Sequence, residues 1–531
     1  ALLIYAAGCQ VSGNGMLWTE EPDPQALPKG SLSEAWAIWA TADSILWRGP
    51  PKGRDTHGLQ FKLHQSWTAD LELQAEGVTG GDTPLTLTAA GSVSADVGAR
   101  FPQYAEYTVL KLPPGVDVAA VVRHQLAISV LNEDGEPVDA MGVQLTGVLD
   151  DCFEYSGPLG AALCREGVEI HLWAPTAQRV SLLRYASAVG DDVAETIPMA
   201  EEAGVWSAKG PVAWAGSYYQ YQVEVYCPWT LRVERSISTD PYSRSLSANG
   251  GRTQIASLDE AALKPKGWDA LGHSKPALEA FTDITLYELH IRDFSALDDS
   301  LPEAARGTYS AFCDPAASGV RHLQGLAAAG LSHVHLLPSY DFGSVDERKD
   351  TWRDPEGDLG AMDCAGREQQ AAVGAIQNCD GFNWGYDPVH YGVPDGSYAS
   401  DPDGTARVVE FRSMVQLTIK EMVRVIKLNM NAECTPCLPI ESFAVAGVEP
   451  SSSLRSEVRP AALHMPLNAL QVEAPAAMDD TTSGTWRTAG RTSDLKEDDG
   501  STPTTAKDSM GRQGVHSAFM FSLITRTISL M

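Results

Sequence analysis

The sequence of 531 residues contains no long hydrophobic run and is poor in basic residues. No stretch of about 18 consecutive apolar residues occurs, so no membrane-spanning helix is expected. Lys and Arg number 39 against 69 Asp and Glu, which gives a formal net charge of −30. Nucleic acids and anionic membranes are bound through clustered Lys and Arg, so neither is an expected partner. The charge is compatible with a neutral or cationic ligand, although it also serves solubility alone.

Cysteine is scarce as well. The nine cysteines are odd in number and do not indicate a disulfide scaffold. Cys434 and Cys437 form a C-x-x-C pair, but no second pair or spaced histidines complete a set of four zinc ligands. The sequence also lacks H-E-x-x-H, the phosphate-binding G-x-x-x-x-G-K-[ST] and the G-x-S-x-G nucleophile elbow. These absences argue against zinc peptidases, P-loop nucleotide hydrolases and α/β-hydrolases.

The composition that is present, 44% hydrophobic and 20% charged, is that of a large folded protein. Residues 31–160 hold short apolar runs between Gly, Pro and Asp turns. Residues 161–262 alternate apolar and polar positions, most clearly over residues 168–173 and 219–226. Alternation buries one face of a strand and leaves the other in water. We therefore expect two consecutive β-sandwich modules, preceded by an extension over residues 1–30.

The pattern changes after Pro276. Residues 284–289 and 333–337 are apolar runs typical of buried parallel strands, and a helical stripe at residues 319–329 separates them. This strand–helix–strand unit predicts a parallel sheet or barrel. Residues 341–381 form a long Asp- and Gly-rich region, which is usually functional in a compact domain. The polar residues of the strands are expected to pair structurally and not to catalyse; they are Glu288, His290, Asp293, His333 and His335.

Three passages carry a resemblance to a known family. They read Y-E-L-H-I-R-D-F-S over residues 287–295, G-F-N-W-G-Y-D-P over residues 381–388, and H-L-W-A-P-T-A over residues 171–177 with D-P-Y-S at 240–243. The chain thus resembles the pullulanase-type starch-debranching enzymes, or limit dextrinases, of the α-amylase superfamily over about residues 31–416. The resemblance implies a pullulanase-type N-terminal β domain at 31–160, a starch-binding-type module at 161–262, and the first part of a (β/α)8 TIM barrel at 276–416.

The N-W-G-Y-D-P passage holds the candidate sugar-binding residues. A pyranose ring offers apolar C–H faces and a rim of hydroxyl groups, which aromatic side chains, carboxylates and amides complement. Asn383, Trp384, Tyr386 and Asp387 supply such groups within five positions. The resemblance implies that Tyr386 and Asp387 bind the glucose whose glycosidic bond is cut. The alternative for this pair is a tyrosine packed on the barrel rim beside a turn-forming Asp-Pro.

The resemblance stops before any catalytic residue. Retaining glycoside hydrolysis needs two carboxyl groups, and the superfamily passages that carry its catalytic machinery, which read like G-F-R-F-D and D-V-V-Y-N-H, do not occur here. The net charge is −28 over residues 1–416 but −2 over residues 417–531. Residues 415–430 predict one amphipathic helix, and residues 479–514 hold few large apolar side chains. We therefore expect a truncated, two-stranded barrel opening and a disordered tail outside the family over residues 417–531, from a shifted frame, a retained intron or an alternative transcript.

The expected function follows from the resemblance. It implies a protein of carbohydrate metabolism that acts on α-1,6 branch linkages of starch, glycogen or pullulan, inactive in the form written here. The alternatives are a non-catalytic α-glucan-binding protein and a non-functional truncated product. The expected partners are α-glucans; no cofactor is required, and calcium is compatible with the Asp-rich loop although no complete ligand spacing occurs. The expected location is the plastid, or a bacterial periplasm or surface if residues 2–9 end a lipoprotein signal.

Overall fold

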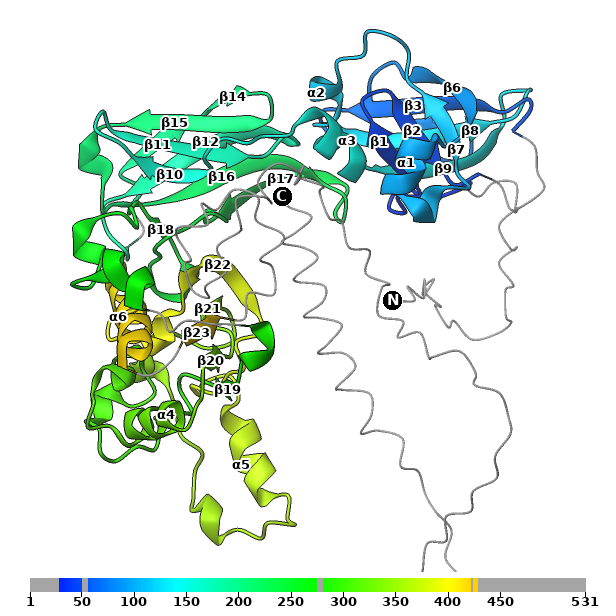
Figure 1. The fold of residues 1–531 in the computed structure, drawn as a ribbon. Coiled ribbons are helices and arrows are strands. Elements are labelled where there is room, and N and C mark those ends of the chain that lie inside the picture. The colour runs from blue at the N-terminus through cyan, green and yellow to red at the C-terminus, as the bar shows by residue number, and fades with distance from the viewer. Residues whose placement is uncertain (1–27, 50–55, 191, 275–279, 422–423, 428–531) are drawn as a thin grey trace, which may run out of the picture. The chain divides into compact units, whose positions relative to one another are not determined.

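The computed structural model describes residues 28–49, 56–190, 192–274, 280–421 and 424–427 (Figure 1). These residues form two β domains followed by an α/β segment. Most of the predicted extension at residues 1–30 and of the predicted tail at residues 417–531 lies outside the described residues. Within the described ranges, no helix has the length and apolar character needed to cross a membrane.

The first domain is built on seven strands whose pairings close into a barrel in the order β1-β2-β7-β6-β3-β8-β9. The β-sandwich expected for residues 31–160 is thus a sandwich-type β domain in which the strand pairings also connect the edges of the two sheets, which closes the barrel. Its strands are β1 (Ala37–Thr41), β2 (Ser44–Trp47), β3 (Gln60–Ser66), β6 (Leu85–Ser92), β7 (Thr108–Lys111), β8 (Gln125–Leu131) and β9 (Pro137–Gln144). A small hairpin, β4 (Glu72–Gln74) and β5 (Gly77–Thr79), and the helices α1 (Ala95–Arg100), α2 (Val118–Val121) and α3 (Thr146–Cys152) complete it.

The second domain is a sandwich of two antiparallel sheets, as the alternation predicted. One sheet has the order β10-β11-β15-β14, with strands at Gly160–Leu163, Val168–Trp173, Val205–Gly210 and Ala200–Glu202. The other has the order β13-β12-β16-β17, with strands at Glu195–Pro198, Ala177–Tyr185, Tyr218–Cys227 and Arg232–Ser238, and β18 (Thr253–Gln254) pairs with β16. Alternate residues of β11, namely Val168, Ile170 and Leu172, are buried in the core. Trp206 of β15 and Trp214 are buried there too.

The α/β segment contains a parallel three-stranded sheet in the order β19-β20-β23. The strands are β19 (Leu286–Leu289), β20 (His333–Leu336) and β23 (Arg424–Lys427), and the connecting helices are α4 (Ser318–Ala328) and α6 (Ala406–Glu421). An antiparallel pair, β21 (Tyr340–Phe342) and β22 (Pro388–Pro394), follows β20, and α5 (Glu368–Ile376) lies in the long loop between them. The strand–helix–strand prediction is confirmed as a parallel sheet, whereas closure into a TIM barrel stays a prediction.

Two expectations at the end of this segment are wrong. The helix predicted over residues 415–430 ends with α6 at Glu421 and gives way to β23. The domain boundary predicted after Gln416 falls inside α6 and stays a prediction. β23 pairs in parallel with β20, so the described sheet has three strands and not two. The physical reason is burial: Thr418 and Ile419 lie in the interior, so residues beyond 416 complete the packing of α6.

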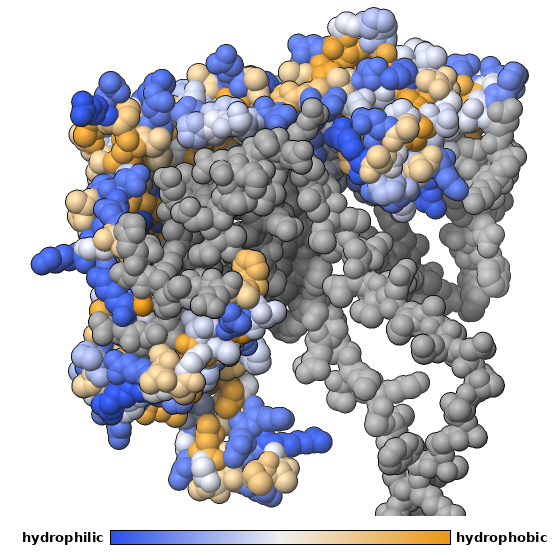
Figure 2. Space-filling model, viewed as in Figure 1, coloured by the Kyte–Doolittle hydropathy of each residue, from blue (hydrophilic) through white to orange (hydrophobic). Residues whose placement is uncertain are grey.

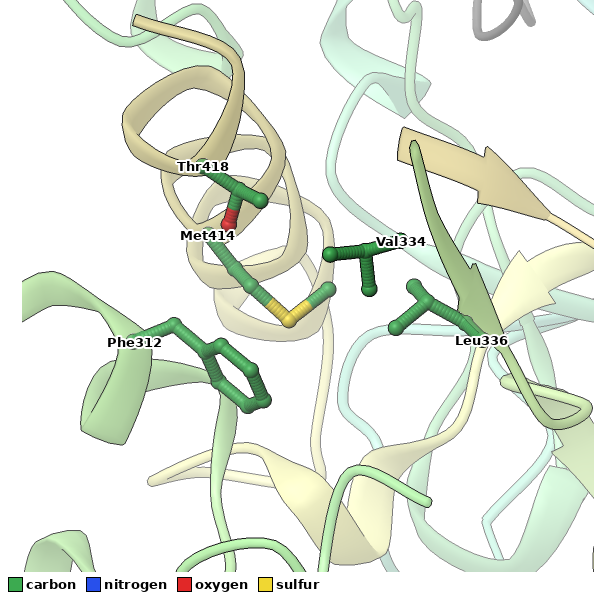
Figure 3. A pocket seen from close by; sticks show the side chains of 5 residues that line it. All are labelled: Phe312, Val334, Leu336, Met414 and Thr418. Atoms are coloured by element: carbon green, nitrogen blue, oxygen red, sulfur yellow. The ribbon is translucent and has the colours of Figure 1, made fainter. Parts of the chain in front are cut away.

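The core of the segment joins α6 to the sheet. Met414 of α6 extends between Phe312 on one side and Val334 and Leu336 of β20 on the other (Figure 3). These side chains are buried, and the hydrophobic effect therefore holds α6 over the sheet. On the outside, hydrophilic and hydrophobic residues are interspersed over the visible face of the described residues (Figure 2).

Candidate functional site

The candidate site is organised by the ends of two parallel strands and by the β21–β22 pair. β19 and β20 run in parallel, so their carboxyl ends, followed by His290 and Leu337, lie at one edge of the sheet. The chain continues into β21, and after the long loop the N-W-G-Y-D-P passage leads directly into β22. Asp341 on β21 is in register with His390 on β22. The predicted sugar-binding residues therefore stand where the long loop rejoins the sheet.

Glycine in the N-W-G-Y-D-P passage is required by the backbone. Gly385 has a φ of 71°, a left-handed conformation that residues with a Cβ rarely adopt. A Cβ at this position would also lie 2.7 Å from the carbonyl oxygen of Pro338. The turn at Gly385 thus brings the passage against the segment that follows β20, with one aromatic residue on each side of the glycine.

Asn383 is buried and anchors the N-W-G-Y-D-P passage to the interior through hydrogen bonds. Its Oδ1 accepts a hydrogen bond from the Tyr398 hydroxyl at 2.8 Å and lies 3.0 Å from Nε2 of His290. The backbone N–H of Asp293 donates to Nδ1 of the same histidine, so Nε2 carries the proton that is donated to Asn383. Burial raises the pKa of Tyr398 well above its usual value, which keeps its hydroxyl a donor. The predicted candidate Asn383 is therefore a satisfied interior amide.

Trp384 and Tyr386 lie on the outside of the same passage. Their exposed fractions are 63% and 45%, large values for aromatic rings held by a fixed loop. Exposed rings of this kind can stack on the apolar face of a sugar. The structure thus places the Asn383 amide in the interior and the rings of Trp384 and Tyr386 on the surface. The fourth candidate, Asp387, supplies a carboxylate.

Asp387 ties the two ends of the long loop together. One of its carboxylate oxygens accepts from the backbone N–H of Gly343 at 3.1 Å, and the other accepts from the Ser344 hydroxyl at 3.3 Å. Burial raises the pKa of Asp387, although these hydrogen bonds oppose the shift. The carboxylate is half-buried beside an exposed ring, an arrangement that suits hydrogen bonding to a hydroxyl-rich ligand.

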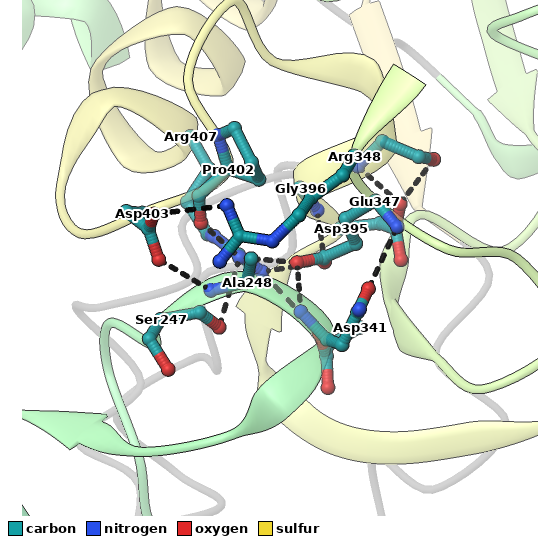
Figure 4. Close-up of polar contacts among 12 residues, drawn as sticks. Ser247, Ala248, Asp341, Glu347, Arg348, Asp395, Gly396, Pro402, Asp403 and Arg407 are labelled. Atoms are coloured by element: carbon teal, nitrogen blue, oxygen red, sulfur yellow. Dashed lines mark hydrogen bonds and ion pairs between the residues drawn. The ribbon is translucent and has the colours of Figure 1, made fainter. Parts of the chain in front are cut away.

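A buried charge cluster connects β21, the long loop that follows it and the start of α6 (Figure 4). The Arg407 guanidinium at the start of α6 donates to both Glu347 oxygens at 2.9 and 2.7 Å and to Asp341 at 3.3 Å. It also donates to the carbonyl oxygens of Pro394, Pro402 and Ser247. Asp395 accepts from the N–H of Phe342 and caps the following turn through Ser397. The planar fork of one arginine thus joins β21, β22, the long loop and α6.

The three carboxyl groups of this cluster are close enough to hold a metal ion. Oxygen atoms of Asp341, Glu347 and Asp395 lie within 4.8 Å of one another. The Arg407 guanidinium forms ion pairs with two of them, Asp341 at 3.3 Å and Glu347 at 2.7 Å, so the protein itself supplies a cation to the cluster. Burial, and then the charges of Glu347 and Asp341, raise the pKa of Asp395 well above its usual value. The guanidinium thus serves as the counter-ion of these carboxyl groups, and calcium binding in the Asp-rich loop stays a prediction.

The same strands are anchored to residues 239–251, which lead out of the second domain. Nδ1 of His390 donates to the Asp341 carboxylate at 2.7 Å, and Nε2 of the same ring lies 2.7 Å from the Thr239 hydroxyl. The Asn249 backbone N–H donates to Glu347 at 2.7 Å, and the Asn249 amide oxygen accepts from the Glu347 N–H at 2.7 Å. Residues near 240–250 are therefore part of the support of the candidate site.

The other polar residues named from the sequence are paired. Glu288 lies 3.0 Å from His335, and Asp293 lies 2.9 Å from Arg292. His333 contacts the Ser332 hydroxyl at 2.8 Å. Structural pairing of these residues is confirmed. The Arg407 cluster, in contrast, was not found from the sequence, because its members stand at unrelated spacings and their charges resemble those of solvated loops; they are Asp341, Glu347, Asp395 and Arg407.

Comparison with known protein families gives two matches. Residues 34–151 match the model of the pullulanase N2 domain. Residues 158–243 match the model of carbohydrate-binding module 48, which is also described as the isoamylase N-terminal domain. The two matches fall on the two β domains of the fold, and the resemblance inferred from the motifs is confirmed.

Curated relatives match beyond these two domains. The chain is 44% identical over 382 residues to the chloroplastic pullulanase 1 of Arabidopsis thaliana, covering 72% of this chain and 39% of that protein. It is 33% identical over 446 residues to the pullulanase of Klebsiella pneumoniae, covering 76% of this chain and 40% of that protein. The chain therefore spans about two fifths of the length of these relatives.

A solved structure agrees with these matches. The crystal structure of Klebsiella pneumoniae pullulanase complexed with maltotriose superimposes with a TM-score of 0.67 at 33% identity. The similarity covers 75% of this chain and 41% of the other. Pullulanases of plant chloroplasts and of bacteria are thus both similar to this chain over a partial segment.

Proposed function

We propose that this chain binds α-glucans. The premise is that it shares with pullulanases an N2 domain, a carbohydrate-binding module 48 and the α/β segment that carries the candidate site. The observation that carries the proposal is the division of roles in the N-W-G-Y-D-P passage. A buried amide, Asn383, fixes the loop, and two exposed rings, Trp384 and Tyr386, flank the required glycine. Asp387 supplies a carboxylate next to the second ring. The maltotriose complex of a similar pullulanase supports the choice of ligand.

The site offers binding groups of the kind that neutral sugars need. Trp384 and Tyr386 provide apolar faces for C–H stacking, and Asp387 accepts hydrogen bonds from hydroxyl groups. The burial of His290, Asn383 and Tyr398 keeps the loop in one conformation before the ligand arrives. Such preorganisation lowers the entropy that binding must overcome.

We further propose that a polypeptide of this sequence alone binds without cleaving α-1,6 linkages. The retaining mechanism needs a nucleophile and an acid/base carboxyl about 5–5.5 Å apart. The superfamily passages that supply catalytic groups do not occur in the 531 residues. Pullulanases are debranching glycoside hydrolases, and of their two steps, glucan binding and bond cleavage, we assign only binding to this polypeptide. For location we propose the plastid, supported by the similarity to a chloroplastic pullulanase.

The binding proposal is tested by co-sedimentation with insoluble starch and by titration with maltoheptaose. We expect retention on starch, and we expect Trp384→Ala and Tyr386→Ala each to weaken maltoheptaose binding about fivefold to thirtyfold, as loss of about 1–2 kcal/mol of stacking would. Phe281→Ala is the matched control, because Phe281 is also an exposed aromatic residue, at 72%, but lies outside the passage. Equal binding by all three variants would contradict the assignment, and no retention at all would favour a non-functional product.

Hydrolysis is tested with pullulan and a reducing-end assay. We expect no release of reducing ends above a heat-treated control. Turnover above that control would overturn the proposal that the polypeptide alone does not cleave.

A further inference from the structure

The exposed apolar surface beside the candidate site continues along β22. Val389 and Tyr391 on this strand are 52% and 39% exposed, whereas His390 between them is buried. Successive side chains of a strand point to opposite faces, so Val389 and Tyr391 share the face that is open to solvent. On the other face, His390 bonds Asp341 of β21. β22 thus has one face that supports the fold and one that is accessible to a ligand.

Asp387, which precedes β22, lies on the same open face. A Cβ at Gly343 would lie 3.3 Å from Cγ2 of Val389 and 3.8 Å from Oδ2 of Asp387, so these two side chains are neighbours. Asp387, Val389 and Tyr391 stand at alternate positions, and the four residue steps between the first and the last span about 13 Å of extended chain. We call these three residues the β22 face. It joins a carboxylate expected to bind sugar to an aromatic ring that the sequence analysis did not single out.

The ring of Tyr391 is held in place by a buried ring. Tyr340 of β21 is buried, and the two rings meet edge to face with their centroids 5.1 Å apart and their planes at 66°. Such a pair fixes the orientation of the exposed ring. Burial, and then the charges that Tyr391, Asp387 and Tyr386 carry when ionised, raise the pKa of Tyr340. These three groups therefore lie near one phenol, and Tyr391 adjoins the candidate site.

The chemistry of the β22 face fits an extended neutral ligand. Residues 386–394 contain no Lys or Arg, so nothing in this stretch favours an anion. Asp387 accepts hydrogen bonds from hydroxyl groups, Val389 offers methyl groups, and Tyr391 offers an aromatic ring with a hydroxyl group. A surface about 13 Å long exceeds the length of one pyranose ring, so several sugar residues joined in a chain match it better than a single one.

We propose that the β22 face extends the candidate site, so that a linear α-glucan binds through several successive glucose residues and Tyr391 selects longer chains. The proposal rests on the function proposed above, and it adds which glucans the site prefers. Once one glucose residue is held at Tyr386, contact of the following residues with the β22 face is intramolecular and costs less entropy. Short oligosaccharides occupy only part of this surface.

The test is calorimetric titration of the full chain with maltose, maltotriose and maltoheptaose. We expect the affinity to rise with chain length. Tyr391→Ala should lower the maltoheptaose affinity about fivefold to thirtyfold and change the maltose affinity less than about twofold. Tyr386→Ala, in contrast, should weaken the binding of both sugars. An equal loss of affinity for maltose and maltoheptaose in the Tyr391→Ala variant, or no loss for either, would overturn the proposal.

Two further variants separate ligand contact from support of the fold. Tyr391→Phe keeps the ring contact with Tyr340 and should bind maltoheptaose within about threefold of the wild-type chain. Val389→Asn changes an exposed side chain outside this ring pair and should lower only the maltoheptaose affinity, about twofold to fivefold. Hydrogen exchange of the β21 amides reports whether each variant keeps the pairing of β21 with β22. Wild-type maltoheptaose affinity in the Val389→Asn variant would count against the β22 face.

Phe281→Ala is again the matched control, because Phe281 is an exposed aromatic residue outside β22. It should bind every oligosaccharide as the wild-type chain does. If the wild-type chain binds no maltooligosaccharide, this proposal and the function proposed above both fail. If it binds maltose and maltoheptaose equally, only the preference for longer chains fails, and glucan binding at the candidate site stands.

Discussion

At the scale of single residues, Arg407 links more chain segments than any of the predicted site residues does. Its guanidinium is buried against Glu347 and Asp341 and against carbonyl groups of three further segments. Burial lowers the pKa of Arg407, but the charges of Glu347 and Asp341 outweigh it and raise the pKa. The residue therefore remains charged, and its partners depend on that charge.

Replacement of Arg407 tests this dependence. We expect Arg407→Met to lower the free energy of unfolding of the α/β segment by about 3–5 kcal/mol, because it leaves buried carboxylates without their cation. Arg407→Lys should recover part of the loss, since it restores the charge but not the planar fork. Hydrogen exchange of the α6 amides at increasing urea concentration measures the change locally.

The control for this prediction is Arg179→Met. Arg179 is 71% exposed and lies 3.7 Å from Glu224, a surface pair that contributes about 0–1 kcal/mol. If the two methionine variants exchange alike, the buried cluster does not stabilise the segment as argued.

Asn383 and Trp384 are adjacent in the sequence but differ in burial. Both are polar or aromatic residues in one short motif, and both were equal candidates for sugar contact. The structure buries the amide against His290 and Tyr398 and exposes the indole ring. Chemical type alone could not separate a residue that supports the loop from one that faces the ligand.

At the scale of elements, α6 and β23 move the end of the folded segment beyond residue 416. Thr418 and Ile419 are buried, and β23 adds a third strand to the edge of β20. An exposed edge of β20 would offer unpaired backbone groups to other chains. The last turn of α6 therefore contributes to the core, and β23 is the third strand of the sheet.

Two truncated chains test the role of these elements. We expect a chain that ends after Gln416 to lose the burial of Ile419, about 1.5–3 kcal/mol, and to expose the β20 edge. It should show faster hydrogen exchange over β20 and lower solubility than a chain that ends after Lys427. The longer chain should match the full sequence over the same amides. Equal exchange in both truncated chains would show that residues 417–427 do not stabilise the sheet.

At the scale of the whole molecule, the net charge of −30 bears on the ligand and not on the fold. Most of it, −28, belongs to residues 1–416, which contain both β domains and the candidate site. A ligand that carries charge would be attracted or repelled over the distance of a Debye length, about 10 Å at 0.1 M salt. A neutral glucan would not.

Salt therefore separates the two kinds of ligand. We expect the maltoheptaose affinity to change less than about twofold between 50 and 500 mM NaCl, because no net charge is neutralised on binding. Isothermal titration at both concentrations measures this. A steep loss of affinity with salt would show that the protein recognises a charged group, and the assignment to neutral sugar would then fail.

The sequence by itself determined the order of the parts and the family they resemble. Alternation at period two predicts the second sandwich because one face of each strand must avoid water. Continuous apolar runs predict the parallel strands, since those strands are buried on both faces. The N-W-G-Y-D-P passage was informative for a similar local reason: Gly385 needs a positive φ, and an aromatic residue stands on each side of it.

Tertiary structure alone decided which polar residues work together. Asp341, Glu347, Asp395 and Arg407 lie up to 66 positions apart, and only the pairing of β21 with β22 and the packing of α6 bring them into contact. Likewise, closure of the first domain into a barrel and the addition of β23 depend on strand partners that no local pattern specifies. Periodicity reports whether a residue faces the interior, but the identity of its neighbour depends on how distant segments pack.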